Sequence, residues 1–249
     1  MKNISFQLYS ARNIPLSDAL KIVADNGYRT VEAYSENVAD MEQFQSLLKA
    51  NHLNCTSAHV ARDELKSNMP AVIEMVAQLD LKQVVCPFLM PEDRPQGTDG
   101  WKKLADELAG YAAEFQTRGI PFAWHNHDFE FEQTSDGDLP MRVLLDTATQ
   151  MQWEIDLGWI QRAGESPDSW LRTYGDRVSS VHLKDVAASG ECSDEDGWAD
   201  VGHGVMNWQA IAAELKSLET EMYIVEHDNP SDVERFAERS IATINSWDL

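Results

Sequence analysis

Short runs in which apolar and polar residues alternate recur along the chain, separated by stretches of helical period. The alternating runs have the length and composition of β-strands. Eight of them are found, at residues 4–10, 29–34, 54–60, 83–88, 121–126, 152–156, 178–183 and 222–227. Between them, apolar residues recur every three or four positions, which predicts helices at 16–24, 41–48, 72–79, 104–115 and 233–244. Weaker helical patterns lie near 138–149 and 167–174.

This alternation predicts an α/β fold. Strands that alternate with helices favour a parallel sheet with covered faces, and eight units in 249 residues match the (β/α)8 TIM barrel in number and size. The main competitor, an open doubly wound sheet, normally has a glycine-rich first βα turn. That turn, residues 8–15 (LYSARNIP), contains no glycine. We therefore predict a closed, eight-stranded parallel barrel in one domain, residues 1–249, without a linker.

The composition is that of a globular chain in a reducing compartment. Hydrophobic residues make up 43% of the chain, enough for a substantial core. The longest apolar stretches, such as residues 84–90, fall far short of the roughly 20 residues that cross a bilayer, and residues 1–10 lack the apolar core of a secretory signal. Three cysteines without CxxC spacing do not suggest a disulfide framework. We expect a cytoplasmic protein that has no membrane partner.

Acidic residues dominate the charge of the chain. Forty-two Asp and Glu residues against 20 Lys and Arg give a formal net charge of −22, and the acids are densest at residues 189–200. A surface of this sign repels the phosphate backbone of nucleic acids, which is bound mainly through Lys and Arg. Nucleic acid is therefore not expected as a partner, and the charge is interpreted as serving solubility.

Side chains that bind metals or carry protons gather at the carboxyl ends of the predicted strands. In a (β/α)8 barrel these ends converge on one mouth, where residues distant in sequence build the active site. Nitrogen and oxygen donors without cysteine suit Mn²⁺, Co²⁺, Mg²⁺, Fe²⁺ or Zn²⁺ and argue against a structural zinc. A divalent metal site is the resulting hypothesis. The residues concerned are Glu32, His59, His125, His127, Asp156, His182 and Glu226.

Some of these residues have an alternative, structural interpretation. Glu32 or His59, taken alone, is as readily explained as a buried hydrogen-bonding group. Asp156 and Glu226 are harder to explain in that way, because an acid at the apolar end of a buried strand must be paired or metal-bound. The acids at residues 194–196 are interpreted as a solvated loop.

Eight segments spread over the chain carry a family resemblance: ISFQLYSAR, GYRTVEAY, TSAHV, HNHDFEF, WEIDLGW, VHLKD, VGHGVMNW and YIVEHD. Taken together they resemble the sugar isomerases and epimerases of the xylose isomerase-like TIM-barrel superfamily. The resemblance implies a metal-dependent enzyme that transfers a proton next to the carbonyl of a sugar, keto-sugar or inosose through an enediolate. Its partner would be a small sugar-like substrate, and a homodimer is compatible because the family often dimerises.

The resemblance also implies a set of metal ligands. Family members usually supply a carboxylate from strand five, Asp from strand six, His from strand seven and Glu from strand eight. The last three positions correspond to Asp156, His182 and Glu226. At strand five, His125 stands where many members have Glu, and Glu130 is the alternative ligand.

The remaining roles that the resemblance implies concern proton transfer and substrate contacts. Glu226 is expected to act as one base, with His127 or His125 as the other. Lys184 is expected to hold a substrate oxygen, and Glu32, His59 and Glu130 are further candidates for substrate binding. A second departure from the family pattern is His203, which stands between two glycines where similar proteins often carry an acid.

Three other functions remain open from the sequence. A histidine that removes a proton without returning it would make a lyase, as in members resembling this HNHD type that eliminate the aglycone from 3-keto-glycosides. Endonuclease IV resembles the same superfamily, but DNA repair would need more metal ligands and a basic surface. A non-catalytic sugar-binding barrel would tolerate loss of the metal set, part of which is altered at strand five.

Overall fold

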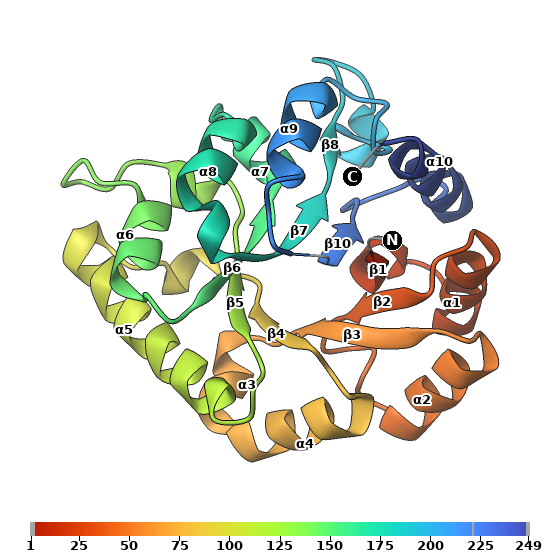
Figure 1. The fold of residues 1–249 in the computed structure, drawn as a ribbon, viewed down its shortest axis with the longest axis horizontal. Coiled ribbons are helices and arrows are strands. Elements are labelled where there is room, and N and C mark those ends of the chain that lie inside the picture. Colours follow the sequence, from red (N-terminus) through yellow and green to blue (C-terminus); the bar gives the residue numbers. More distant parts are fainter. Residues whose placement is uncertain (1–2, 221, 248–249) are drawn as a thin grey trace.

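The computed structural model describes residues 3–220 and 222–247, and over these residues it forms a closed barrel of eight parallel strands. Helices surround the barrel as a ring (Figure 1). The expected (β/α)8 fold is therefore confirmed. In barrel order, the strands are β1 (Asn3–Gln7), β10 (Met222–Val225), β7 (Val178–Leu183), β6 (Gln152–Asp156), β5 (Phe122–His125), β4 (Gln83–Cys86), β3 (Asn54–His59) and β2 (Thr30–Ala33).

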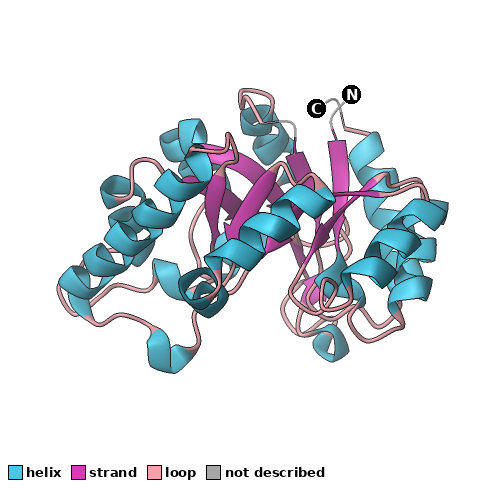
Figure 2. Ribbon diagram, turned by 90° about the horizontal axis from the view of Figure 1, so that it is seen from below, coloured by secondary structure: helices cyan, strands magenta, loops and turns pink. Residues whose placement is uncertain are grey.

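The helices of the described residues lie outside the strands, as the cyan and magenta ribbons of Figure 2 show. All five helices with a clear apolar period are present, and the two weaker patterns correspond to α6 and α8. The helices are α1 (Leu16–Asp25), α2 (Met41–Ala50), α3 (Arg62–Ser67), α4 (Met69–Leu79), α5 (Gly97–Gln116), α6 (Pro140–Thr147), α7 (Leu157–Arg162), α8 (Pro167–Tyr174), α9 (Trp208–Leu215) and α10 (Val233–Asn245).

Several short elements were not expected from the sequence. Helices α3, α7 and α9 span only six to eight residues each, too few for a clear apolar repeat. An antiparallel pair, β8 (Asp185–Val186) and β9 (Trp198–Ala199), follows β7 outside the barrel. Single 3₁₀ turns complete the connections, among them η5 (Ser193–Glu195).

The apolar core lies between the barrel and the helices. Alternate strand residues point outward and meet aromatic side chains of the helices, as expected from the period of two along a strand. Phe122 of β5 stacks on Phe115 of α5, with 5.7 Å between ring centroids. Phe6 of β1 packs against Phe236 of α10 at 5.6 Å. This packing holds the helices against the strands and leaves the inner face of the barrel for other residues.

The inside of the barrel is polar. His182 on β7 bonds to Glu32 on β2, and His59 on β3 bonds to Glu154 on β6. Neither pair of strands is adjacent, so these side chains meet through the barrel interior. Bulky apolar residues usually fill this space, so its polar filling marks a specialised interior. The buried polar residues of the barrel strands are Ser5, Gln7, Thr30, Glu32, Ser57, His59, Gln83, His125, Glu154, Asp156, Ser180 and His182.

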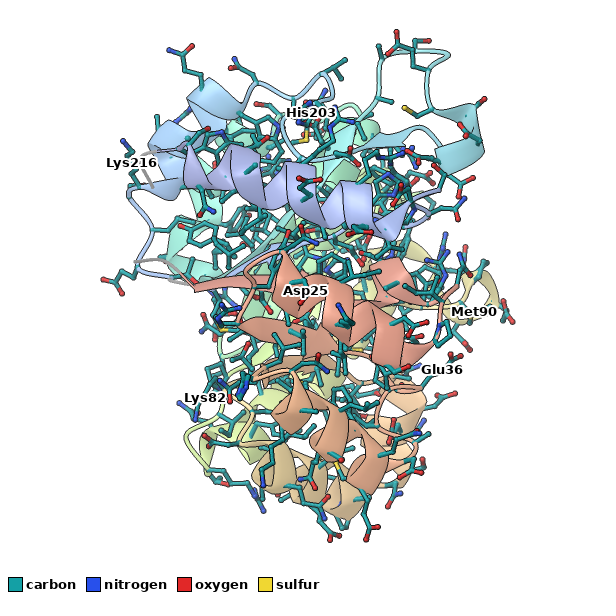
Figure 3. All side chains as sticks on the ribbon, turned by 90° about the vertical axis from the view of Figure 1, so that its right-hand side faces the viewer. Asp25, Glu36, Lys82, Met90, His203 and Lys216 are labelled. Carbon is teal, nitrogen blue, oxygen red and sulfur yellow. The ribbon has the colours of Figure 1, made fainter. Side chains whose placement is uncertain are left out.

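The two ends of the barrel can be told apart in a side view. In Figure 3, Glu36 and Met90, which follow β2 and β4, lie at the right. Lys82 and Lys216, which precede β4 and β10, lie at the left. The right-hand side is therefore the carboxyl end of the strands, where this fold places its active sites.

Asp185 organises the segment that follows the β8–β9 pair. Its carboxylate accepts hydrogen bonds from the backbone nitrogens of Gly202 (2.9 Å) and Gly204 (3.1 Å) and from Trp208 Nε1 (2.7 Å). A Cβ atom on Gly204 would lie 2.2 Å from the carbonyl oxygen of Val186, so only glycine fits this close approach. The VGHGVMNW motif is thus built around a buried carboxylate, and its His203 is exposed.

One expectation about the acidic loop is wrong. Asp194 and Asp196 are exposed, but Glu195 is buried. Glu195 Oε1 accepts hydrogen bonds from the Ser231 backbone nitrogen (2.7 Å) and from Arg235 Nη2 (2.8 Å). A charge run in sequence does not reveal a partner 40 positions away. The Glu195–Arg235 ion pair therefore joins the loop between β8 and β9 to the start of α10.

Two further features concern the cysteines and the possibility of a membrane span. Cys55, Cys86 and Cys192 are all free thiols, and the first two are buried. Among the helices of the described residues, none has both the length and the apolar character that a membrane span requires.

Candidate functional site

Four side chains from the ends of neighbouring strands converge at the carboxyl end of the barrel. His125, Asp156, His182 and Glu226, called the outer cluster below, offer ligand atoms that all lie within 4.8 Å of one another. His182 Nδ1 lies 2.9 Å from Glu226 Oε2, and His125 Nε2 lies 3.9 Å from Asp156 Oδ2. The strand register produces this arrangement, since Asp156 on β6 pairs with His182 on β7.

The outer cluster has the chemistry of a divalent cation site. Asp156 Oδ1 accepts a hydrogen bond from the Trp159 backbone nitrogen (2.8 Å), but Asp156 Oδ2 is buried without a hydrogen-bond partner. Burial raises the pKa of Asp156 to about 7, with Glu226 adding to this effect and Lys184 opposing it. The Lys184 ammonium lies 3.7 Å from this oxygen, too far for a hydrogen bond, so the oxygen remains open to a proton or a metal cation. Two imidazoles and two carboxylates are donors that fit divalent metals.

A second set of contacts lies deeper in the barrel, and sequence reasoning missed its central residue. Glu154 Oε1 lies 2.7 Å from His59 Nε2 and 3.0 Å from His182 Nε2. Glu32 Oε1 lies 2.8 Å from His182 Nε2 and accepts a hydrogen bond from Gln7. Glu154 stands two residues before Asp156 on one strand, so the period of two could have indicated that both face inward.

The buried carboxylates and imidazoles shift one another's pKa values in opposite directions. Burial alone would lower the pKa of His59, but Glu32 and Glu154 outweigh it and raise the value to about 10. Carboxylates likewise outweigh burial at His182 and raise its pKa. His125 differs, because burial and the neighbouring His182 lower its pKa to about 4. His125 therefore remains neutral, as a metal ligand must be, whereas His182 would lose a proton when a metal binds.

Lys184 is a buried ammonium group beside the outer cluster. Its Nζ donates to Asp228 Oδ1 (2.6 Å) and to Glu226 Oε2 (3.2 Å). Burial would lower the pKa of Lys184, but Asp228 and Glu226 outweigh it and raise the value. A Cβ atom on Gly158 would lie 2.9 Å from the Lys184 carbonyl oxygen, so glycine permits α7 to pack closely against β7. Asp228 was not singled out from the sequence.

A cavity of about 450 Å³ opens beside these residues. Of the outer cluster, His125 and Glu226 reach it, together with His59 and Asp228. The rest of its wall is largely aromatic. Near the rim, Arg12 lies 4.1 Å from the centre of the Tyr9 ring and donates a hydrogen bond to the Asp228 carbonyl oxygen. The other lining residues are Tyr9, Tyr34, Ser35, Ala61, Pro87, Phe88, His127 and Trp159.

The residues of the segment HNHDFEF have two kinds of role: some belong to the site, and others support it. His127 lines the cavity, and its ring lies 4.9 Å from that of Phe88 and 5.0 Å from that of Trp159. Asn126 joins β5 to β6, because its Oδ1 accepts from the Asp156 backbone nitrogen (3.0 Å). Glu130 is buried and does not line the cavity.

Glu130 has partners of its own. Its carboxylate accepts hydrogen bonds from Trp124 Nε1 and from the His127 backbone nitrogen, both at 2.9 Å. Burial raises the pKa of Glu130 to about 8. The structure therefore brings His125, and not Glu130, to the outer cluster.

Comparison with protein families identifies the fold by sequence as well. The family model described as "Xylose isomerase-like TIM barrel" matches residues 20–247. This match covers nearly all of the barrel, including every residue of the outer cluster.

Solved structures share the fold at low sequence identity. A sugar phosphate isomerase/epimerase from Parabacteroides distasonis superposes with a TM-score of 0.80 and 20% identity, covering 99% of this chain and 94% of that one. The IOLI protein with a bound zinc atom superposes with a TM-score of 0.77 and 16% identity, covering all of both chains. Identities of this size establish a common fold alone.

Curated relatives match over a shorter region. An inosose dehydratase of Clostridium beijerinckii is 30% identical over 88 residues, which are 35% of this chain and 29% of that protein. An inosose dehydratase of Bacillus thuringiensis is 31% identical over 86 residues, 34% of this chain and 28% of that protein. The matched region thus spans under a third of the length of these relatives.

Proposed function

Because the chain belongs to the xylose isomerase-like TIM-barrel family, we propose that it is a divalent-metal-dependent isomerase or epimerase of sugars, keto-sugars or inososes. The observation that supports this most strongly is the outer cluster, in which a buried carboxylate oxygen without a hydrogen-bond partner faces two imidazoles. The cluster adjoins a cavity large enough for a small organic ligand.

Each residue of the outer cluster would act as a ligand. The metal, when bound, supplies Lewis-acid polarisation of a substrate carbonyl, which makes the neighbouring C–H more acidic. The nitrogens available to it are His125 Nε2 and His182 Nδ1, and the oxygens are those of Asp156 and Glu226.

His127 is the proposed base that removes the proton from the carbon next to the carbonyl. Burial and the neighbouring His125 hold the pKa of His127 well below its usual range, so the ring is neutral and able to accept a proton at neutral pH. Its Nδ1 has no hydrogen-bond partner. Because Nδ1 is buried, the nitrogen proposed to accept the proton is Nε2 of this ring, which lines the cavity.

Glu226 and Lys184 are the proposed partners on the other side of the substrate. Burial would raise the pKa of Glu226, but Lys184 and His182 outweigh it and hold the value well below the usual range. Glu226 is therefore charged, as both a ligand and a proton acceptor must be. The Lys184 ammonium bonds to Asp228 and Glu226 and does not line the cavity, so its proposed part is to hold these two carboxylates, which do line it.

We further propose that the substrate carries no phosphate. Among the described residues that line the cavity there is no Lys or Arg, whereas Glu226 and Asp228 are both present. The guanidinium of Arg12, beside the lining residue Tyr9, already donates to a backbone carbonyl. Phosphate is normally bound through Arg, Lys or a cluster of backbone N–H groups, so the two carboxylates favour an uncharged polyol.

A second candidate is a lyase of the same site. Two observations favour it: the identity to inosose dehydratases, and an aromatic side of the cavity, formed by Tyr9, Tyr34 and Phe88, that could hold a group attached to the sugar ring. In this reaction His127 removes the proton and a substituent β to the carbonyl leaves. Elimination of the aglycone from a 3-keto-glycoside is the specific form.

Solvent-deuterium exchange into a panel of ketoses, inososes and 3-keto-glycosides tests both candidates. Protein of measured metal content should catalyse the incorporation of deuterium into the substrate, at the carbon next to the carbonyl. Chelation of the metal should abolish this activity, and addition of a divalent ion should restore it. The variant His203→Ala, in which an exposed histidine outside the cavity is removed, is the matched control and should behave as wild type.

The products separate the two candidates. An isomer or epimer supports the first, and an unsaturated ketone with a released substituent supports the second. Absence of exchange by metal-loaded protein across the panel would contradict both and favour a non-catalytic sugar-binding barrel.

A further inference from the structure

Glu154 is a fully buried carboxylate on β6 that takes no part in the proposed proton transfer. Its Oε1 atom faces three imidazole nitrogens. The distances are 2.7 Å to His59 Nε2, 3.0 Å to His182 Nε2 and 3.4 Å to His125 Nδ1. One carboxylate oxygen is therefore the meeting point of histidines from β3, β5 and β7, two of which belong to the outer cluster.

The orientation of this carboxylate is held from the other side. Glu154 Oε2 accepts hydrogen bonds from Ser180 Oγ (2.7 Å) and Gln83 Nε2 (3.2 Å). Gln83 and Ser180 are themselves buried and bonded to each other at 2.6 Å. Rotation of the carboxylate would break these bonds in a site without solvent, so Oε1 stays directed at the imidazoles.

The two cluster histidines turn opposite nitrogens toward Glu154. His125 presents Nδ1 to it, and His182 presents Nε2. The remaining nitrogens face the outer cluster, with His125 Nε2 3.9 Å from Asp156 Oδ2 and His182 Nδ1 4.0 Å from the same oxygen. A neutral imidazole has one N–H and one lone pair, and a carboxylate only accepts, so His125 carries its N–H on the Glu154 side. His182 Nδ1 also lies 2.9 Å from Glu226 Oε2, and a metal held by these two atoms would replace that contact and leave the N–H of His182 on Nε2.

From this geometry we infer that Glu154 is a positioning residue for the outer cluster. With a metal at the outer cluster, it selects the Nδ1–H tautomer of His125 and, together with Glu32, the Nε2–H tautomer of His182, and so directs one lone pair of each ring at the same point. The inference rests on the proposed function, because it needs a metal at the outer cluster. Carboxylates that accept the second N–H of a ligating histidine orient the ring and increase its basicity.

The effect should be larger at His125 than at His182. Glu32 Oε1 also lies 2.8 Å from His182 Nε2, so this ring keeps an acceptor when Glu154 is changed. His125 Nδ1 forms no hydrogen bond to any other described residue. Its 3.4 Å contact with Glu154 is long for a hydrogen bond, but Glu154 is the only described carboxylate that faces this nitrogen.

The inner side of the same rings offers a competing metal position. Ligand atoms of His59, His125, Glu154 and His182 also lie within 4.8 Å of one another. Hydrogen bonding favours the positioning role, because both oxygens of Glu154 have partners whereas Asp156 Oδ2 has none. An inner ion is therefore an outcome that the experiment must recognise.

The experiment compares the zinc affinity and the histidine tautomers of wild type and Glu154→Gln. Zinc affinity is measured by competition with a chromophoric chelator, and the tautomers by long-range ¹H–¹⁵N NMR of the zinc-loaded protein. In wild type we expect Nδ1–H on His125 and Nε2–H on His182. In Glu154→Gln we expect zinc binding to weaken by about 10- to 100-fold, together with loss of the single His125 tautomer.

Two further variants keep the test decisive. Glu195→Gln removes a buried carboxylate that contacts no residue of the outer cluster and should lower stability while leaving zinc affinity unchanged. Ser180→Ala retains the Glu154 charge but removes a donor to its Oε2, and should weaken zinc binding less than Glu154→Gln. If Glu154→Gln does not fold, the wild-type tautomers and Ser180→Ala decide.

The possible failures are distinguishable. Wild type that binds neither zinc nor another of the candidate divalent ions would defeat the proposed function itself, and this inference with it. A folded Glu154→Gln with wild-type affinity and tautomers would overturn the positioning role alone. Zinc bound to wild type through His59 Nε2 and His182 Nε2 would identify the inner group as the metal site and likewise overturn it.

Discussion

At the residue scale, His125 and His127 show how two similar side chains acquire different surroundings. His125 is buried and directs Nε2 toward Asp156. His127, two positions on, lies in the cavity wall against Phe88 and Trp159. A nitrogen bound to a metal cannot also accept a proton. The two residues are therefore expected to divide the roles of ligand and base.

Substitution of each histidine tests this division. His125→Ala should lower both metal content and turnover, because it removes a ligand. His127→Ala should retain the metal and lower turnover by roughly 10² to 10⁴, the usual loss for a general base. Elemental analysis and the deuterium exchange rate measure the two quantities. Retained metal with lost turnover in His125→Ala would reverse the roles, and unchanged turnover in both variants would make the motif structural.

At the same scale, the sequence indicated which residue types would meet but not how they are oriented. Strand periodicity was enough to expect Asp156 and His182 at one mouth. It did not single out Glu154, because the sequence around an acid between Trp153 and Ile155 is the same whether the acid bonds to a histidine or faces solvent. The choice depends on His59, 95 positions away.

At the element scale, the β8–β9 pair and the segment after it depend on one carboxylate. Asp185 accepts from four backbone nitrogens and from Trp208 Nε1. Each of these donors would lose its partner if the carboxylate were removed. The pair was not expected from the sequence because two-residue strands carry no measurable alternation.

Asp185→Ala is expected to destabilise the protein by about 1–3 kcal/mol, the cost of buried donors left without an acceptor. Urea unfolding measures the loss. Hydrogen exchange at the amides of Gly202 and Gly204 should become faster than at the barrel strands. Asp194→Ala, at an exposed acid on the same connection, is the control and should leave both quantities near wild type. Unchanged amide exchange in Asp185→Ala would contradict the structural role.

At the scale of the whole molecule, Glu195 links acid stability to the packing of α10. Burial would raise the pKa of Glu195, but hydrogen bonds from Ser231 and Arg235 outweigh it and lower the value from 4.5 to about 2. A depressed carboxyl pKa stabilises the fold above the unfolded value, and this contribution is lost as the pH falls through the folded value. The relevant window therefore extends from about pH 5 down to about pH 2.

The variant Glu195→Gln should reveal this contribution as a pH-dependent difference. At about pH 6 it should be less stable than wild type by about 1.5–3 kcal/mol, as for hydrogen bonds to a charged group. The difference should begin to shrink below about pH 5 and be small near about pH 2, because wild type loses the same interaction across this range. Urea unfolding across this range measures it. A difference that stays constant with pH would show that ionisation of Glu195 is not involved.

The net charge of −22 makes a second prediction for the whole molecule. Binding to duplex DNA should be undetectable even at low salt, where contacts to phosphate are strongest. Fluorescence anisotropy of a labelled duplex is a suitable measurement. Salt-sensitive binding in the micromolar range would instead support the DNA-repair hypothesis.

The sequence by itself determined the number and order of the barrel strands, the clearer helices and the mouth at which ligand-type side chains gather. These features follow from periodicity, which is local, and from the rule that parallel strands in a barrel end at the same face. Only the tertiary structure decided which nitrogen of each histidine faces the outer cluster. It also decided that Glu130 is buried away from the cavity and that Glu195 is buried. Each of these depends on a contact or a packing direction set by neighbouring elements. Hydrogen bonds formed across the barrel interior have no counterpart in the local pattern of the chain.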